Sequence, residues 1–226
     1  MKKIGILGGI SPASTLHYYG TLHDLFYQKH KNYYYPEMVV ESLNFQYFTD
    51  LENENRMDEY CRYILQGLGN LKNAGADFAI MAANSPHSVL EEIRPDAPLP
   101  ILSIVDTVGQ EARAKNMERL LLTGIGYTMR GIFYQQGLKK YGIEVITPSP
   151  EEQDTINGII FSELVINEVN PASKKRFLQI IESYPVDGVI LGCTELPQLI
   201  SQRDTQVSLL NSLLLHCTAA LDYTGR

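Results

Sequence analysis

Short apolar, β-branched runs alternate along this chain with longer stretches of helical period. The clearest helical pattern precedes Gly75 and places these residues on one face: Met57, Cys61, Ile64, Leu65, Leu68 and Leu71. A second predicted helix has Ile156, Ile159, Ile160, Leu164 and Val165 on one face. The predicted strands are Ile4 to Leu7, Met38 to Ser42, Phe78 to Met81, Ile101 to Ile104, Leu120 to Thr123, Glu144 to Ile146, Gly188 to Leu191 and Val207 to Leu210. This alternation predicts an α/β protein whose mainly parallel sheets are flanked by helices.

The pattern also indicates an approximate internal duplication. The strand that ends at Gly8 and Gly9 resembles the one that ends at Gly124, and the segment around Ala83 resembles the one around Cys193. We therefore expect two similar lobes with the active-site cleft between them, at the carboxyl ends of the strands. The first lobe is predicted to comprise residues 1–104 with about 207–226, and the second residues 105–206.

Composition narrows the classes of function. With 226 residues, 44% of them hydrophobic, the chain can form real cores. Its formal net charge of −7 and scattered basic residues argue against nucleic-acid binding, which needs clustered Lys and Arg. Since no apolar run approaches the roughly 20 residues that span a bilayer, we expect no membrane partner.

The three cysteines, Cys61, Cys193 and Cys217, match neither a disulfide framework nor a zinc ribbon. A reducing, cytoplasmic location is the natural expectation, and the first residues lack the features of a cleaved leader. Cys61 and Cys217 fall on helical patterns and are interpreted as core residues.

A glycine-rich turn follows the first predicted strand, from Gly5 to Pro12. It fits neither phosphate-binding glycine motif, so nucleotide binding is disfavoured. A tight turn whose backbone amides and following helix hold a carboxylate is the better interpretation. Ser11, Ser14 and Thr15 are candidate helix caps or ligand donors.

Cys193 lies in the run Gly192-Cys193-Thr194-Glu195, directly after a buried-looking strand. Such a position near helix amides favours the thiolate over the thiol, whose ordinary pKa is about 8.5. A small buried core cysteine is the competing interpretation, but the flanking residues favour a reactive one.

These motifs resemble the cofactor-independent aspartate/glutamate racemase family, in particular its broad-specificity amino-acid racemases. The resemblance runs nearly end to end. The residues that carry it are Ile4 to Ser11 with Ser14-Thr15, Asn84-Ser85-Pro86-His87, Tyr127-Thr128-Met129 with Phe133-Tyr134, and Gly192 to Glu195.

The resemblance implies racemisation of a small amino acid or related carboxylate, without metal or pyridoxal phosphate. One residue at each of two strand ends removes or returns the α-proton, and Cys193 is one of them. Because that hydrogen is very weakly acidic, preorganised donors must stabilise the developing charge. The resemblance also implies a homodimer. The expected substrate-binding residues are Ile10, Glu52, Ala83, Asn84, Ser85, Thr128, Thr194 and Glu195.

Several positions depart from the family pattern. Ala83 replaces the Cys or Thr that supplies the second proton carrier, and alanine has no proton to exchange. Two-way racemisation then requires water or Ser85 as a substitute. Ser85 replaces the usual Thr and Asn211 the usual Asp.

Glu52 falls where the subgroup tends to have a neutral amide near the substrate side chain. A carboxylate there disfavours an aspartate or glutamate substrate by like-charge repulsion. An exposed acid without function is the alternative interpretation.

His87 and His216 are candidate acid/base or orienting residues, and His216 is a possible donor near Cys193. Packing histidines are the competing interpretation for both.

Two other functions stay open besides a racemase. One is single-cysteine protonation of the decarboxylase type, as in arylmalonate decarboxylases of the wider superfamily. The other is a catalytically silent homologue that binds an amino acid or carboxylate.

Overall fold

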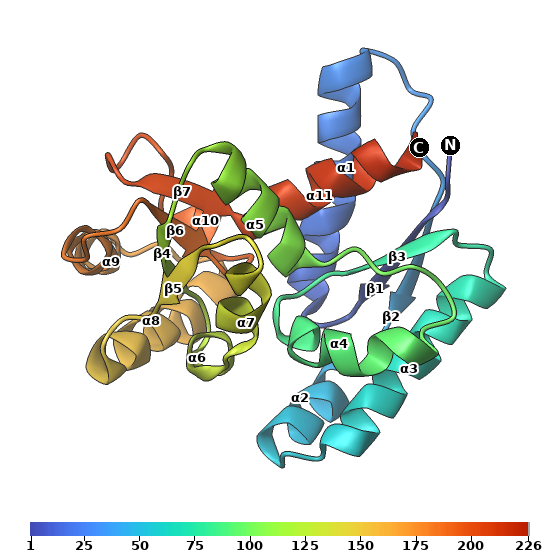
Figure 1. Cartoon of the computed structure of the whole chain (residues 1–226), viewed down its shortest axis with the longest axis horizontal. Helices are drawn as coiled ribbons and strands as arrows, with labels where there is room; N and C mark the ends of the chain where they lie inside the picture. The colour runs from blue at the N-terminus through green and yellow to red at the C-terminus, as the bar shows by residue number, and fades with distance from the viewer. Residues whose placement is uncertain (226) are drawn as a thin grey trace. The chain divides into compact units, whose positions relative to one another are not determined.

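A computed structural model describes residues 1–225, which divide into two compact units, shown in Figure 1. Unit 1 comprises Met1–Ser103 with the chain from His216, and unit 2 comprises Ile104–Leu215. Each unit contains a fully parallel sheet flanked by helices, which confirms the predicted α/β class.

The sheet of unit 1 has the strand order β2-β1-β3. Its elements are β1 (Ile4–Gly8), α1 (Pro12–His30), β2 (Met38–Ser42), α2 (Phe45–Asn53), α3 (Met57–Asn73), β3 (Phe78–Met81), the 3₁₀ turn η1 (Ser85–Val89), α4 (Leu90–Ile93) and η2 (Arg94–Asp96), with most of α11 (Ser212–Thr224). Leu7 and Met81 pack with α2, α3 and α4 in one apolar cluster. Figure 1 shows α1 and α11 on the other side of this sheet.

The sheet of unit 2 has the order β5-β4-β6-β7, so it repeats the arrangement of unit 1 with one additional strand. Its elements are α5 (Ile104–Ala114), β4 (Arg119–Thr123), α6 (Gly126–Arg130), α7 (Phe133–Lys139), β5 (Glu144–Ile146), α8 (Pro150–Ser162), η3 (Leu164–Ile166), α9 (Pro171–Glu182), β6 (Gly188–Leu191), α10 (Leu196–Leu199) and β7 (Ser208–Asn211). Alternate residues of β4 and β6 face two separate apolar clusters, so both faces are covered.

Two predictions about the elements are wrong. The segment Ile101 to Ile104 forms only an isolated bridge between Ile101 and Ala79, and α5 begins at Ile104. The strand expected at Val207 to Leu210 exists as β7, but it pairs with β6 and belongs to unit 2. The return to unit 1 therefore takes place within α11 and not at residue 207.

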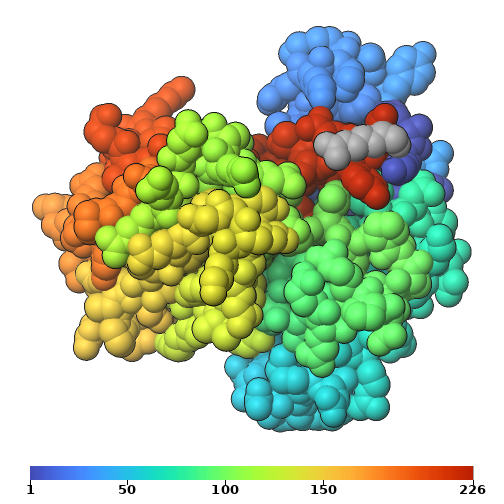
Figure 2. Space-filling view, viewed as in Figure 1, coloured from blue at the N-terminus to red at the C-terminus, as the bar shows by residue number. Residues whose placement is uncertain are grey.

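The end of α1 and the segment after it project from unit 1, as the blue surface in Figure 2 shows. Several large side chains there are exposed, including Tyr33 and Tyr34. Over residues 1–225, none of the helices combines the length and the apolar character that crossing a membrane requires.

Candidate functional site

The turn between β1 and α1 brings the chain close to the end of β3. Gly9 has φ +80°, and a Cβ there would lie 2.3 Å from the carbonyl oxygen of Leu43, so only glycine fits. Ser11 caps α1 by accepting from the backbone N–H of Ser14 at 3.3 Å. Ile10, expected in the site, is buried in the apolar cluster of unit 1.

The hydroxyls of Ser14 and Thr15 in this turn form hydrogen bonds within the protein. Thr15 accepts from the Gly9 N–H at 2.8 Å and donates to the Ser11 carbonyl at 3.0 Å. The Ser14 hydroxyl donates to the carbonyl of Ala82, which ties α1 to the residue before Ala83. The Gly9 amide is therefore already bonded, and Ser14 and Thr15 act as caps and ties.

The second predicted motif, the segment from Ala83 to Ser85, lies at the end of β3. Ala83 is partly buried, and Asn84 and Ser85 are buried beside it. Glu52 on α2 accepts from the Tyr60 hydroxyl at 2.7 Å and also hydrogen-bonds Ser85. Burial raises the pKa of Glu52 above its usual value, and both hydrogen bonds oppose that rise. The structure thus places Glu52 next to the motif and not among the freely exposed acids.

His87 and His216 form a buried aromatic pair in unit 1, with ring centroids 5.5 Å apart. His216 bonds the Tyr18 hydroxyl through Nδ1 at 3.0 Å and the Leu102 carbonyl through Nε2 at 3.1 Å. Because both of its ring nitrogens are engaged, the interpretation of His216 as a packing residue is favoured over that of a donor near Cys193. Burial lowers the pKa of His216 to about 4 and that of His87 well below its usual value, so both rings are neutral at pH 7.

Unit 2 places Cys193, Thr194 and Glu195 together after β6. All three side chains are buried. The Cys193 thiol donates to Glu195 Oε2 at 2.9 Å, and the Thr194 hydroxyl donates to the same oxygen at 2.7 Å. A thiol and a carboxylate therefore share one short contact at the carboxyl end of a parallel strand.

This contact overturns the prediction of a favoured thiolate. Burial and, after it, the adjacent Glu195 carboxylate raise the pKa of Cys193 well above the usual value. Backbone hydrogen bonds from Thr194 and Glu195 act in the opposite direction but are outweighed. The helix that follows, α10, has only four residues, and the full charge of Glu195 lies closer to the sulfur. At rest, Cys193 is a protonated thiol.

Thr128 on α6 is fully buried, and its hydroxyl oxygen has no hydrogen-bond partner among the described residues. A Cβ at Gly124 or at Gly192 would lie 3.5 Å from Thr128 atoms, so this residue packs on the ends of β4 and β6. Since buried hydroxyls are normally bonded, Thr128 has capacity for a ligand or water.

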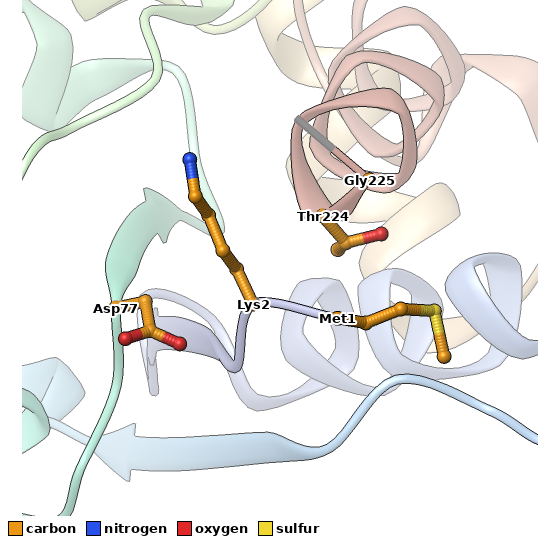
Figure 3. A pocket seen from close by; sticks show the side chains of 5 residues that line it. All are labelled: Met1, Lys2, Asp77, Thr224 and Gly225. Atoms are coloured by element: carbon orange, nitrogen blue, oxygen red, sulfur yellow. The ribbon is translucent and has the colours of Figure 1, made fainter.

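Two cavities elsewhere contain little of this chemistry. One of about 510 Å³ lies at the opposite, amino ends of β1 and β3, lined by Met1, Lys2, Asp77, Thr224 and Gly225 (Figure 3). Another, of about 370 Å³, contains Cys61. Burial and nearby Glu92 raise the pKa of Cys61 to about 11, so that thiol is unreactive at neutral pH. Cys217 is buried as well, which agrees with its interpretation as a core residue.

Sequence analysis missed two tyrosines that are hydrogen-bond partners of candidate residues. Tyr60 bonds Glu52, and Tyr18 bonds His216. Both tyrosines lie on the buried faces of helices, where the pattern indicates only packing. The available signal was their hydroxyl group, because a fully buried tyrosine usually needs a hydrogen-bond partner.

Two parallel β-sheets flanked by helices, with a buried thiol and a buried carboxylate at the end of one strand, define the class: an α/β protein with a candidate thiol acid/base site. A comparison with family models makes the assignment specific: residues 7–220 match the Asp/Glu/Hydantoin racemase family, to which the chain belongs.

Individual relatives agree with this assignment. The chain is 26% identical to the broad-specificity amino-acid racemase RacX of Bacillus subtilis, over 92% of each chain. The structure of an aspartate racemase homologue from Pyrococcus horikoshii is similar over 100% of both chains, with 35% identity and a TM-score of 0.90. A candidate Asp/Glu racemase from Yersinia pestis, 29% identical over 100% of both chains, gives a TM-score of 0.93.

Proposed function

We propose that this protein is an amino-acid racemase that works without pyridoxal phosphate and uses Cys193 to carry the α-proton. The observation that carries this proposal is the 2.9 Å hydrogen bond from the Cys193 thiol to the buried Glu195 carboxylate. A proton carrier must both give and take a proton, and a thiol bonded to a base can do so. The similarity to RacX, named for broad-specificity amino-acid racemisation, supports an amino-acid substrate.

The raised pKa of Cys193 assigns an order to the proton transfers. As a thiol, Cys193 is ready to protonate a carbanion at the α-carbon. To abstract the α-proton, it first passes its own proton to Glu195 Oε2, and the resulting thiolate then accepts the α-proton. Thr194, which bonds the same carboxylate oxygen, keeps Glu195 in place.

The substrate is expected to have a neutral or basic side chain. Glu52 lies beside Ser85, and a carboxylate there repels an acidic substrate side chain. Thr128, which packs beside Gly192, is a proposed carboxylate-binding donor, and Ile10, Asn84 and Ser85 stay predicted substrate-binding residues. The homodimer, the cytoplasmic location and the cleft expected from the sequence stay predictions.

A second candidate is one-sided protonation, as in decarboxylases that use a single cysteine. Cys193 is held as a thiol, which suits a proton donor, and Ala83 offers no exchangeable proton. A silent homologue that binds amino acids is the third.

Exchange of the α-hydrogen in deuterated water tests the proposal. The full-length protein is incubated with single enantiomers of neutral and basic amino acids, and deuterium uptake is followed by NMR. We expect exchange that is lost in Cys193→Ala and retained in Cys61→Ala, a matched variant of another buried cysteine.

Exchange that survives in Cys193→Ala would refute the role of this thiol. Thermal stabilisation by amino acids without exchange would indicate the binding homologue. Release of carbon dioxide from an arylmalonate would indicate the decarboxylase chemistry.

A further inference from the structure

Helix α1 has apolar and aromatic side chains over more of its circumference than the rest of the described chain covers. Its buried residues are Ser14, Thr15, Tyr18, Leu22 and Phe26. Beside them, a second row at spacings of three and four residues is exposed or partly exposed: Leu16, Tyr19, His23 and Tyr27. A helix that packs on one side only normally has polar residues on its outward face. The outer row of α1 therefore indicates a contact with another molecule.

The segment after α1 extends this row into one connected aromatic surface. Tyr27 stacks on Tyr33 with ring centroids 5.5 Å apart, and Tyr33 contacts Tyr35 at 6.2 Å. Tyr35 in turn contacts His23 at 4.7 Å, and His23 contacts Tyr19 at 4.4 Å. This part of the chain forms the blue projection in Figure 2. We call these five rings, with Leu16 and Tyr34, the α1 aromatic surface.

The size of the α1 aromatic surface approaches that of a stable protein interface. Its most exposed side chains, between 39% and 82% exposed, are Leu16, Tyr19, Tyr27, Tyr33 and Tyr34. Because a large side chain has about 200 Å² to bury, these five leave about 600 Å² open. A patch of that size is at the upper end for a monomer, and a standard interface buries about 800 Å² per partner. Exposed side chains at its border supply the remaining area.

The charge of this surface fits a second copy of the same chain. Leucine and tyrosine are uncharged at pH 7, whereas the whole chain has a formal net charge of −7. In a symmetric dimer the same surface faces itself, so a charged surface would repel its copy and an uncharged one does not. The nearby cations are already engaged: Lys29 forms an ion pair with Asp222 at 3.0 Å, and Lys31 lies over the Tyr27 ring at 5.8 Å.

We propose that the α1 aromatic surface is the interface of a homodimer, in which it packs on the same surface of a second copy about a two-fold axis. Side chains at spacings of three and four residues form the ridges with which helices pack, so α1 lies against α1 of the partner. The tyrosines after the helix cover the edge of this contact, where their hydroxyls reach water. The homodimer expected from the sequence had no assigned interface, and the exposed rings locate it. The interface is independent of the proton chemistry proposed for Cys193.

Sedimentation of the full-length protein over a wide concentration range tests the proposal. One variant, Leu16→Glu, adds a charge to each of the two facing surfaces, and a second combines Tyr33→Ser with Tyr34→Ser. The matched control is Phe161→Ser, which removes an exposed aromatic ring of α8. We expect a dimer in the wild-type protein and in the control. The dissociation constant of the dimer should rise about 100-fold or more in each surface variant.

Two further measurements separate loss of the interface from loss of the fold. Because the substituted side chains are exposed, circular dichroism spectra of the variants should match that of the wild-type protein. Amide hydrogen exchange over residues 31–35 should slow as the wild-type concentration rises, since the contact covers this segment. The same residues should exchange at a concentration-independent rate in Leu16→Glu.

Three outcomes would overturn the proposal. The first is a wild-type protein that sediments as a monomer at every concentration. The second is a dimer whose dissociation constant is unchanged in both surface variants, because its interface would then lie elsewhere. The third is a monomer that binds vesicles of phosphatidylcholine and phosphatidylglycerol and loses this binding in Leu16→Glu, which would identify lipid as the partner of the surface.

Discussion

Replacing Glu195 by Gln should lower the pKa of the Cys193 thiol. The side chain keeps nearly the same shape but loses the charge that lies 2.9 Å from the sulfur. At an effective dielectric constant of about 20, a unit charge at that distance contributes about 6 kcal/mol, or about 4 pKa units, as an upper bound. Since protein and solvent relaxation reduce this value, we expect a decrease of about 2 units or more.

The thiolate absorbs in the ultraviolet, so a pH titration of absorbance measures the change directly. Cys193→Ser in each background removes the signal of Cys193 and leaves that of Cys61 and Cys217. Burial, the larger cause of the raised pKa, is the same in Glu195→Gln. A titration that moves by less than half a unit would therefore show that burial alone holds the thiol protonated, and the role assigned to Glu195 would be rejected.

Two predictions concern stability. The pKa of His216 is lowered from 6.5 to about 4, so the unfolded chain binds its proton first as pH falls through this range. The free energy of unfolding should then decrease by about 3 kcal/mol between pH 6.5 and 4. Urea titrations should show that the free energy of unfolding depends less steeply on pH in His216→Gln than in the wild-type protein. Equal pH dependence in the two proteins would contradict this prediction. Gly9→Ala should destabilise by about 2 kcal/mol or more because of its positive φ and because a Cβ would lie too close to the backbone of Leu43. The control Gly20→Ala within α1, where a Cβ meets nothing within 4 Å, should stabilise by about 1 kcal/mol in thermal melts.

Local patterns in the sequence were sufficient to predict most of the fold. Parallel strands covered on both faces are continuous apolar runs, so strands such as Phe78–Met81 and Gly188–Leu191 are predicted with the observed limits. The run Ile101 to Ile104 has the same apolar character, yet only Ile101 reaches a strand partner and Ile104 begins a helix. Strand pairing depends on the neighbouring chain, which the local pattern does not contain.

Some features of the candidate site could likewise be predicted from the sequence, and others could not. Sequence alone located the ends of strands such as β3 and β6 and the position of Cys193 after β6, because these depend on local residue patterns, whereas the resemblance to the family drew attention to Ala83. Tertiary structure decided the protonation of Cys193 and the partners of Glu52, since a pKa depends on burial and on charges within a few ångströms. The carboxylate of Glu195 is two residues from Cys193 in the chain, but only the folded turn directs it toward the sulfur.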